Sequence, residues 1–116
     1  MSKKRRDKDF LGDINEAINL ISLYTKGLTY RKFLEDRKAQ DAVVRNLEVI
    51  GEASKNIAAA FKAKYPDVPW KKVAGLRDKL IHFYFGVDYK IVWSIVKKEL
   101  PKLSKQVKEI LKQEAD

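Results

Sequence analysis

The sequence has no cysteine and a single histidine, His82, among its 116 residues. Without cysteine the chain can form neither a disulfide framework nor a thiolate nucleophile, and one histidine cannot complete the usual zinc ligand sets. A glycine-rich phosphate loop is also missing. We therefore expect no metal and no cofactor, so that any catalysis must come from the side chains of the chain itself.

Long apolar runs are missing as well. No window approaches the roughly 18 consecutive apolar residues that a membrane-spanning helix needs. The basic run at residues 3–6 is followed by Asp7, Lys8 and Asp9, whereas an export signal would continue with an uncharged apolar stretch. We therefore expect a soluble protein of the cytoplasm with no membrane partner.

Basic residues exceed acidic ones. Lysine and arginine total 25 and aspartate and glutamate 16, which gives a formal net charge of +9. Such a surface attracts polyanions through counterion release, and RNA is the obvious partner class. The alternative is that scattered lysines only solvate the polar faces of helices, and composition alone does not choose between the two.

Helical spacing dominates the hydrophobic pattern. Hydrophobic residues make up 45% of the chain, which suits one domain over residues 1–116 with a genuine core. Apolar positions recur at three- and four-residue steps in the segments 10–24, 43–61, 70–84, 91–96 and 103–111. No segment alternates with period two. The pattern predicts an all-α fold, an antiparallel up-and-down bundle of four or five helices.

Glycines and prolines mark the expected ends of these helices. Gly27 follows the first helix, and two prolines within 65–69 forbid continuation of the second. The last of these prolines suits the first position of the third helix, which Gly86 ends. Asp88 can cap the fourth helix, and Pro101 kinks or breaks the chain before the last one.

Arg77 stands out within the third predicted helix. At ~100° per residue, Arg77 falls about 20° from Trp70, in the middle of the apolar stripe where leucine would be expected. Burying this permanent charge without a partner would cost on the order of several kcal/mol. The side chain must therefore meet a carboxylate or an amide, or open into a cleft that receives an anion.

Asp78 and His82 lie four residues apart, so on one helix their side chains are neighbours. A carboxylate beside an imidazole fixes its tautomer and raises its basicity. On a continuous helix His82 would lie ~140° from Arg77, too far round for a simple pair on the same face. A site that uses both residues must be closed by another element or by another subunit.

The second predicted helix offers possible partners. Asn46 and Ser54 fall on or beside its apolar face, and Asn46 can orient Arg77 or a phosphate. A purely structural reading is also open, in which Arg77, Asn46 and Ser54 form a satisfied polar network between packed helices. In the same way His82 can be a half-exposed flank residue. The aromatic run 83–85 can stack on bases or pack in a core or dimer contact.

The residues from Arg77 to Tyr84, RDKLIHFY, resemble the R-x4-H-x-Y signature of HepT-like toxins, members of the HEPN (higher eukaryote and prokaryote nucleotide-binding) superfamily. The resemblance covers nearly the whole chain. It includes the blocks 41–53, 69–76 and 85–88, in the same order around the motif. An isolated R-x4-H string is common by chance, but this arrangement is specific.

The resemblance implies an antiparallel HEPN-like helical bundle that dimerises and brings two motifs to a shared cleft. It also implies a metal-independent endoribonuclease with RNA as substrate. By that likeness Arg77 and His82 are catalytic: His82 acts as general acid or base around the ribose 2′-hydroxyl and the leaving oxygen, and Arg77 stabilises charge on the phosphate. Asp78 would orient the pair.

The resemblance further implies a partner, an antitoxin resembling a minimal nucleotidyltransferase (MNT), which adenylylates the motif tyrosine, here Tyr84. On a continuous helix Arg77 and Tyr84 are about 20° from eclipsed, so AMP on Tyr84 would set a bulky anion against Arg77. The alternative function is a non-catalytic helical subunit that binds nucleotide or substrate for a nucleotidyltransferase complex.

Overall fold

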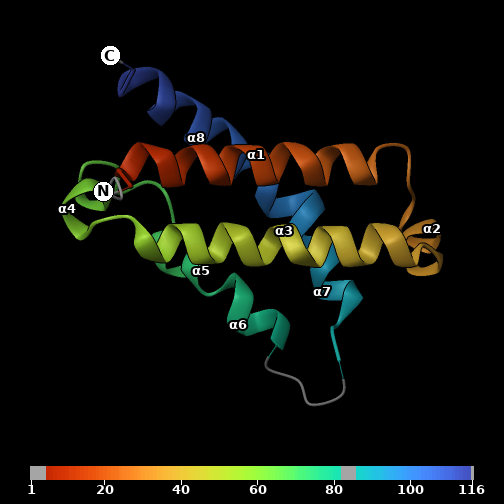
Figure 1. The fold of residues 1–116 in the computed structure, drawn as a ribbon. Coiled ribbons are helices and arrows are strands. Elements are labelled where there is room, and N and C mark those ends of the chain that lie inside the picture. Colours follow the sequence, from red (N-terminus) through yellow and green to blue (C-terminus); the bar gives the residue numbers. More distant parts are fainter. Residues whose placement is uncertain (1–4, 82–85, 116) are drawn as a thin grey trace.

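The computed structural model describes residues 5–81 and 86–115, and all regular structure within these ranges is helical (Figure 1). Two long helices, α1 (Asp7–Thr25) and α3 (Arg37–Asn56), lie side by side and run antiparallel. Two short helices, α5 (Trp70–Ala74) and α6 (Leu76–Ile81), pack on α3, and the C-terminal helix α8 (Leu100–Gln113) packs on α1. The predicted all-α fold is confirmed.

The core lies between the long helices and follows the predicted hydrophobic stripes. The side chains of α1 and α3 that are buried there share three- and four-residue spacing: Leu11, Ile14, Ile18, Ile21, Val43, Leu47 and Ile50. Asp36 begins α3, where its carboxylate accepts a hydrogen bond from the Ala39 amide at 3.0 Å. At the far end of α1, Gly27 adopts φ +76°, the left-handed conformation expected of a terminating glycine.

The sequence pattern missed one helix, α2 (Tyr30–Glu35). Thr29 caps it, and Phe33 is its one buried side chain. The Gln40 amide of α3 donates to the carbonyls of Phe33 and Leu34, both at 3.0 Å, and so fixes the C-terminal end of α2. Six residues bury too few side chains to show a period, which explains the omission.

The second predicted helix was too long. It ends at Asn56, and Ile57 turns to extended backbone before α4 (Ala59–Ala63). An Asp7 carboxylate oxygen accepts a hydrogen bond from the Ala58 amide at 2.9 Å. This contact joins residues 51 positions apart and links the turn that follows α3 to the start of α1. Apolar spacing within a single segment carries no information about such a contact.

The third predicted helix is divided. Gly75 separates α5 from α6, so residues 70–84 are not one continuous helix. This junction packs on α3: a Cβ at Gly51 would stand 3.3 Å from the Arg77 amide nitrogen and 3.4 Å from the Ala74 carbonyl oxygen. The glycine therefore lets α3 approach the α5–α6 junction closely. Angles counted along an unbroken helix through Arg77 therefore do not hold.

The C-terminal third bends without breaking. The Asp88 carboxylate accepts from the Lys90 and Ile91 amides at 3.0 and 3.4 Å, which confirms the predicted cap of α7 (Tyr89–Ser94). A π-helical turn, η1 (Ile95–Glu99), then leads into α8. Pro101 has no amide hydrogen to bond the carbonyl four residues earlier, and the wider turn accommodates this defect.

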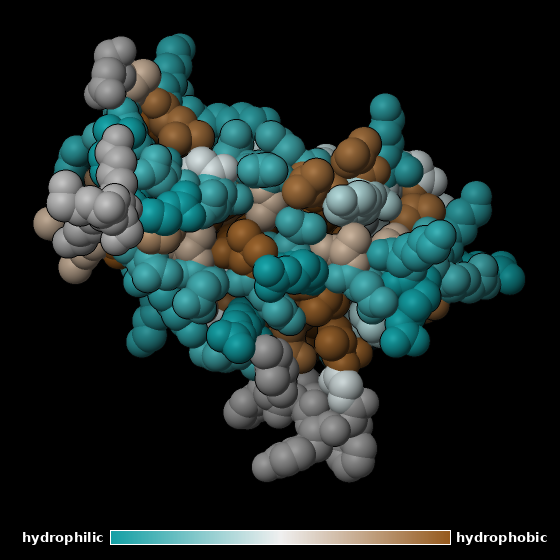
Figure 2. All heavy atoms as spheres, in the orientation of Figure 1, coloured by the Kyte–Doolittle hydropathy of each residue, from teal (hydrophilic) through white to brown (hydrophobic). Residues whose placement is uncertain are grey.

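Hydrophilic side chains cover most of the face in Figure 2, and apolar atoms show mainly in the gaps between helices. In the part of the chain that the structure describes, no helix combines the length and the apolar character needed to cross a lipid bilayer.

Candidate functional site

An open cleft of about 340 Å³ lies where the start of α1, the second half of α3 and the start of α6 meet. Its lining consists of Arg5, Phe10, Asp13, Arg45, Glu48, Val49, Glu52, Ala53, Asn56 and Arg77. Three guanidinium groups and three carboxylates thus line the cleft together with the apolar side chains of Phe10, Val49 and Ala53. An anion can bind one of these arginines while the other charged side chains of the cleft neutralise one another.

Arg77, the second residue of α6, reaches this cleft from its rim. Its side chain is 49% exposed, and Nη1 stands 3.7 Å from Oε2 of Glu52, which is itself 58% exposed. The prediction that Arg77 sits within a buried apolar stripe is wrong, because Gly75 interrupts the helix on which that position was counted. The prediction that it meets a carboxylate or faces a cleft is confirmed, since it does both.

Asp78 follows Arg77 but points into solvent. Its side chain is 75% exposed, and one of its carboxylate oxygens lies 4.0 Å from the Lys55 ammonium. His82 and Tyr84 lie outside the described residues. The predicted catalytic partnership of Arg77 with His82, the orienting contact of Asp78 and the modification of Tyr84 therefore stay predictions.

The structure does not bring Asn46 to Arg77. The Asn46 amide donates to the Ala42 carbonyl of its own helix at 2.8 Å. Asn46 is ~140° round α3 from Gly51, the residue that faces the α5–α6 junction. Ser54 is fully buried, and its hydroxyl has no hydrogen-bond partner among the described residues. The expected network of Arg77, Asn46 and Ser54 is not formed.

Sequence reasoning missed Glu52, the residue that Arg77 actually meets. A signal was present: Arg45, Glu48, Glu52 and Asn56 follow at steps of three, four and four, so they share one face of α3. These four residues all line the cleft. The search for polar residues on apolar faces overlooked them because they form the polar face of their helix.

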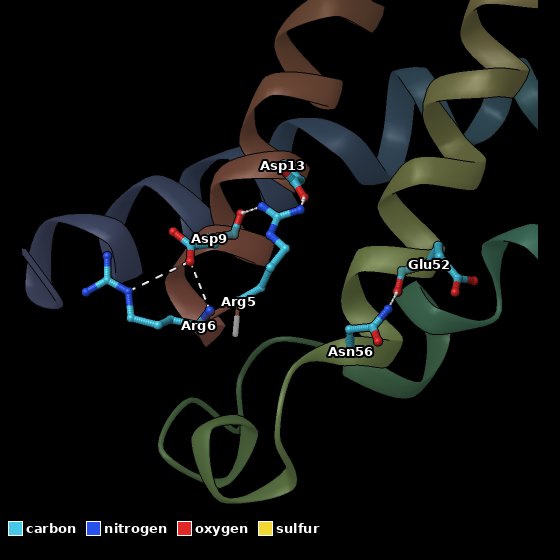
Figure 3. Close-up of polar contacts among 6 residues, drawn as sticks. All are labelled: Arg5, Arg6, Asp9, Asp13, Glu52 and Asn56. Atoms are coloured by element: carbon cyan, nitrogen blue, oxygen red, sulfur yellow. Dashed lines mark hydrogen bonds and ion pairs between the residues drawn. The ribbon is translucent and has the colours of Figure 1, made fainter. Parts of the chain in front are cut away.

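The opposite wall of the cleft is held by its own contacts (Figure 3). Arg5 pairs with Asp13 at 2.8 Å, donates to the Asp9 carbonyl at 3.2 Å and lies 4.8 Å from the centre of the Phe10 ring. The hydrogen bond to Asp13 raises the pKa of Arg5 above its ordinary value. Arg5 is thus already committed, whereas Arg77 has only a long contact among the described residues and is the better candidate to bind an anion.

The α3 wall carries a further contact. The Asn56 amide donates to the Glu52 carbonyl at 2.9 Å, and in Figure 3 both residues lie across the gap from Arg5 and Asp13. Within the described ranges no group of three histidine, aspartate or glutamate side chains is placed to hold a metal ion. The cleft side chains can contribute stabilisation of negative charge by a guanidinium group.

These observations define a class: a small, all-helical protein with an open cleft and an arginine available at its rim. The ribonuclease HepT-like family matches the chain over residues 14–110, and the chain belongs to this family. It is therefore a member of a family of enzymes that act as ribonucleases.

Relatives support the same assignment. The chain is 50% identical to the "Probable ribonuclease HepT" of Thermococcus cleftensis, with 94% of this chain and 99% of the relative covered. A protein of Methanocaldococcus jannaschii and one of Caldanaerobacter subterraneus, both named "Putative RNase", are 50% and 47% identical. These matches cover 94% and 92% of this chain and 90% and 96% of the relatives. No solved structure is significantly similar.

Proposed function

We propose that the protein is the toxin of a toxin–antitoxin system, a metal-independent endoribonuclease of the cytoplasm in which Arg77 and His82 act on RNA. One observation carries the proposal. The family match spans the R-x4-H-x-Y residues 77–84, and the arginine of that motif stands half exposed at the rim of a cleft, 3.7 Å from Glu52. A phosphate can reach it there without unfolding the core.

The chemistry needs no metal. The ribose 2′-oxygen attacks the adjacent phosphorus as a base takes its proton, the bond to the 5′-oxygen breaks, and an acid protonates that oxygen. The product ends are a 2′,3′-cyclic phosphate and a 5′-hydroxyl. His82 would serve as the base or the acid, and the Arg77 guanidinium would stabilise the negative charge that builds on the phosphate oxygens. Asp78 would position His82.

A homodimer would supply the second motif. α6, which carries Arg77, stands at the edge of the bundle on the side of α3, away from α1 and α8 (Figure 1). An edge helix of this kind can face its copy across a twofold axis without disturbing the core. The two motifs would then face each other across a shared cleft, where Arg77 of one subunit and His82 of the other could act on one phosphodiester.

Cleavage is the direct test. Unmodified protein should cut single-stranded RNA in the presence of EDTA and leave cyclic phosphate ends, whereas Arg77→Ala and His82→Ala should each lose about 10²-fold or more, as expected for loss of a charge-stabilising or proton-transfer group. Arg31→Ala is the matched control, because Arg31 is highly exposed and, within residues 5–81 and 86–115, pairs only with Glu35 of the same helix. RNA binding without cleavage would instead support the non-catalytic subunit.

We also propose that a nucleotidyltransferase antitoxin silences the enzyme by adding AMP to Tyr84. The added phosphate would carry negative charge to the motif and compete with RNA for Arg77. After co-expression with such a partner, intact mass should show one or more AMP additions that Tyr84→Phe removes. Tyr24→Phe is the control, since Tyr24 is an exposed tyrosine of α1. If Tyr84→Phe retains the added mass, another residue is the acceptor.

A further inference from the structure

We infer that a second surface, the groove between the C-terminal half of α1 and the η1–α8 segment, binds the backbone of single-stranded RNA outside the cleavage cleft. The inference rests on the proposed function, because it assumes that RNA is the ligand. The observations that carry it are the charges of the groove, its free polar groups and the aromatic rings at one end.

The groove consists of two adjoining hollows that share Asn19, Ser22, Thr25 and Lys97. Together they are lined by Ile18, Asn19, Ile21, Ser22, Leu23, Thr25, Lys26, Gly27, Val96, Lys97, Leu100, Pro101, Ser104, Lys105 and Lys108. This lining has four lysines and no carboxylate. The cleft at Arg77, by contrast, has three carboxylates among its lining residues.

The four lysines of the groove are Lys26, Lys97, Lys105 and Lys108, all of them exposed. None of them forms an ion pair with another residue in the described part of the chain. Elsewhere lysines do find acids: Lys64, for example, pairs with Glu114 at 2.8 Å. The groove therefore keeps positive charge that is not compensated by contact, the condition under which phosphates displace counterions.

Polar side chains without a charge lie between the lysines. Asn19 and Ser22 are exposed and Ser104 is partly buried, and all three line the groove. Amide and hydroxyl groups of this kind hydrogen-bond phosphate and sugar oxygens, which positions a nucleic acid without reading its bases. Thr25 is already committed, since its hydroxyl donates to the Ile21 carbonyl at 2.8 Å.

Aromatic rings at one end favour single-stranded RNA over other polyanions. The Lys97 ammonium lies 4.8 Å from the centre of the Trp93 ring, and Trp93 is 6.1 Å from the ring of Tyr30, which is 37% exposed. Unpaired bases stack on such rings, whereas the bases of a duplex are already stacked on one another. Trp93 is itself partly buried and packs on Phe33, with ring centres 5.0 Å apart, so Tyr30 is the ring that a base can reach. Lysines beside aromatic rings are the usual composition of a single-strand track.

The groove is too long for a single phosphate and lies apart from Arg77. Eleven residues of helix separate Lys97 from Lys108, which corresponds to roughly 16 Å along the axis. α8 packs on α1, whereas α6 packs on α3, so the two sites are on different sides of the α1–α3 pair (Figure 1). A long RNA can contact both sites, whereas a dinucleotide can occupy only the cleft.

The test compares two triple variants of the full chain with the same net charge. Lys97→Ala/Lys105→Ala/Lys108→Ala removes three lysines of the groove. The control removes three other exposed lysines that line none of the hollows described and form no ion pair within the described ranges: Lys38→Ala/Lys71→Ala/Lys112→Ala. Binding of a 2′-O-methylated single-stranded RNA, which cannot be cleaved, is measured over a range of salt concentrations, with thermal melting as the check on folding.

For the groove variant we expect about 10- to 100-fold weaker binding at 0.1 M salt and a slope of log K against log salt that is shallower by about 2, near 0.7 for each lysine. The control should keep most of the wild-type affinity and slope. Equal losses of RNA affinity in both variants, or no loss in either, would overturn the inference. It would also be overturned if the groove bound an acidic protein while the affinity for RNA stayed unchanged in the groove variant. Failure of wild-type protein to bind RNA would overturn it as well.

Cleavage assays separate this inference from the proposed function. The groove variant should raise KM for a long RNA and leave turnover of a dinucleotide unchanged. If wild-type protein binds RNA through the groove but cuts nothing, the nuclease proposal fails and the groove stands. If it cuts RNA and the groove variant behaves as the control does, the groove fails and the nuclease stands.

Discussion

Arg77 and Glu52 form a contact that is too long and too exposed to hold the guanidinium firmly. Their charged atoms are 3.7 Å apart, and both side chains are about half accessible to solvent. Exposed pairs of this kind contribute roughly 0–1 kcal/mol. A phosphate offers more acceptor oxygens than one distant carboxylate oxygen, so RNA can displace Glu52 at little cost.

Replacing the acid tests this competition. Glu52→Gln should tighten binding of uncleavable single-stranded RNA by about two- to fivefold, the factor that corresponds to the upper part of the range for an exposed pair. Fluorescence anisotropy measures it. Glu35→Gln is the control, because it removes an exposed pair of similar length, 3.9 Å to Arg31, on α2. Weaker binding by Glu52→Gln alone would show that Glu52 orients Arg77 rather than competing for it.

At this scale the sequence drew attention to Arg77 but not to its surroundings. Arg77 is visible as a charge at a position that an unbroken helix would bury, and as part of a motif. The spacing places Glu52 on the polar face of α3, but its pairing with Arg77 was not predictable, because pairing across helices depends on how closely α3 and α6 approach. Asn46 was predicted as a partner of Arg77, but it lies on another face of α3. Its amide donates to the Ala42 carbonyl of the same helix.

At the scale of helices, that close approach depends on Gly51. A Cβ there would meet the Arg77 amide nitrogen at 3.3 Å and the Ala74 carbonyl at 3.4 Å, both of them backbone atoms. Backbone cannot rotate out of the way as a side chain can. Even one added methyl group therefore has to push the α5–α6 junction outward, and Arg77 moves with it.

Gly51→Ala should consequently lower the free energy of unfolding by about 1–2 kcal/mol, as overpacking does, and should reduce RNA cleavage through the displaced Arg77. Urea unfolding measures the first effect. Gly12→Ala is a matched control on α1, where an added Cβ has no neighbour within 4 Å. It should gain up to about 1 kcal/mol from helix propensity. Equal behaviour of the two variants would show that α3 and the junction have room to spare.

The elements with long periodic faces were predictable, and the interruptions between them were not. The spacing of apolar residues located α1, most of α3, α8 and the joined α7–η1 segment, because about three turns or more of burial leave a clear period. The breaks after Asn56 and at Gly75 lie beside contacts with α1 and α3, at Asp7 and Gly51 respectively. Such contacts join positions far apart in the chain, and a local pattern does not register them.

A cluster of polar groups fastens the end of α8 to the turn after α4. Glu114 accepts hydrogen bonds from the Lys64 ammonium, at 2.8 Å, and from the Tyr65 hydroxyl. These bonds, first that of Lys64 and then that of Tyr65, lower the pKa of Glu114 below its ordinary value. The hydrogen bond to Glu114 raises the pKa of both Lys64 and Tyr65. The three groups therefore keep the protonation states that these hydrogen bonds require from acidic to strongly alkaline pH.

The stability from Glu114 should therefore vary with pH. A carboxyl whose pKa is lower in the folded state stabilises the fold above the unfolded value, here 4.5, and this contribution is lost as pH falls through the folded pKa. Thermal melting of Glu114→Gln and wild type should differ at pH 6 and converge towards pH 3. Glu109→Gln, on the same helix, is the control for loss of one charge. A difference that persists at pH 3 would contradict the assignment.

At the scale of the whole molecule, charge is distributed unevenly. The net charge of +9 is balanced locally at the Arg77 cleft, which includes three carboxylates among its lining residues, and unbalanced in the groove of α1 and α8, which has none. The two proposals thereby assign the attraction of RNA and the chemistry on RNA to different surfaces. The composition indicated a basic protein, but only the packing of α8 on α1 gathers the lysines into a groove.

The proposed dimer makes a prediction that a monomeric enzyme would not fulfil. If each active centre takes Arg77 from one subunit and His82 from the other, a dimer of one Arg77→Ala chain and one His82→Ala chain has one intact centre and one that lacks both groups. Random exchange of the two inactive variants gives half mixed dimers, each with one of two centres intact. The mixture should therefore regain about a quarter of the wild-type cleavage activity. Centres that take both residues from the same chain would leave every dimer inactive, so a mixture that stays silent after subunit exchange, verified by native mass spectrometry, would exclude the shared centre.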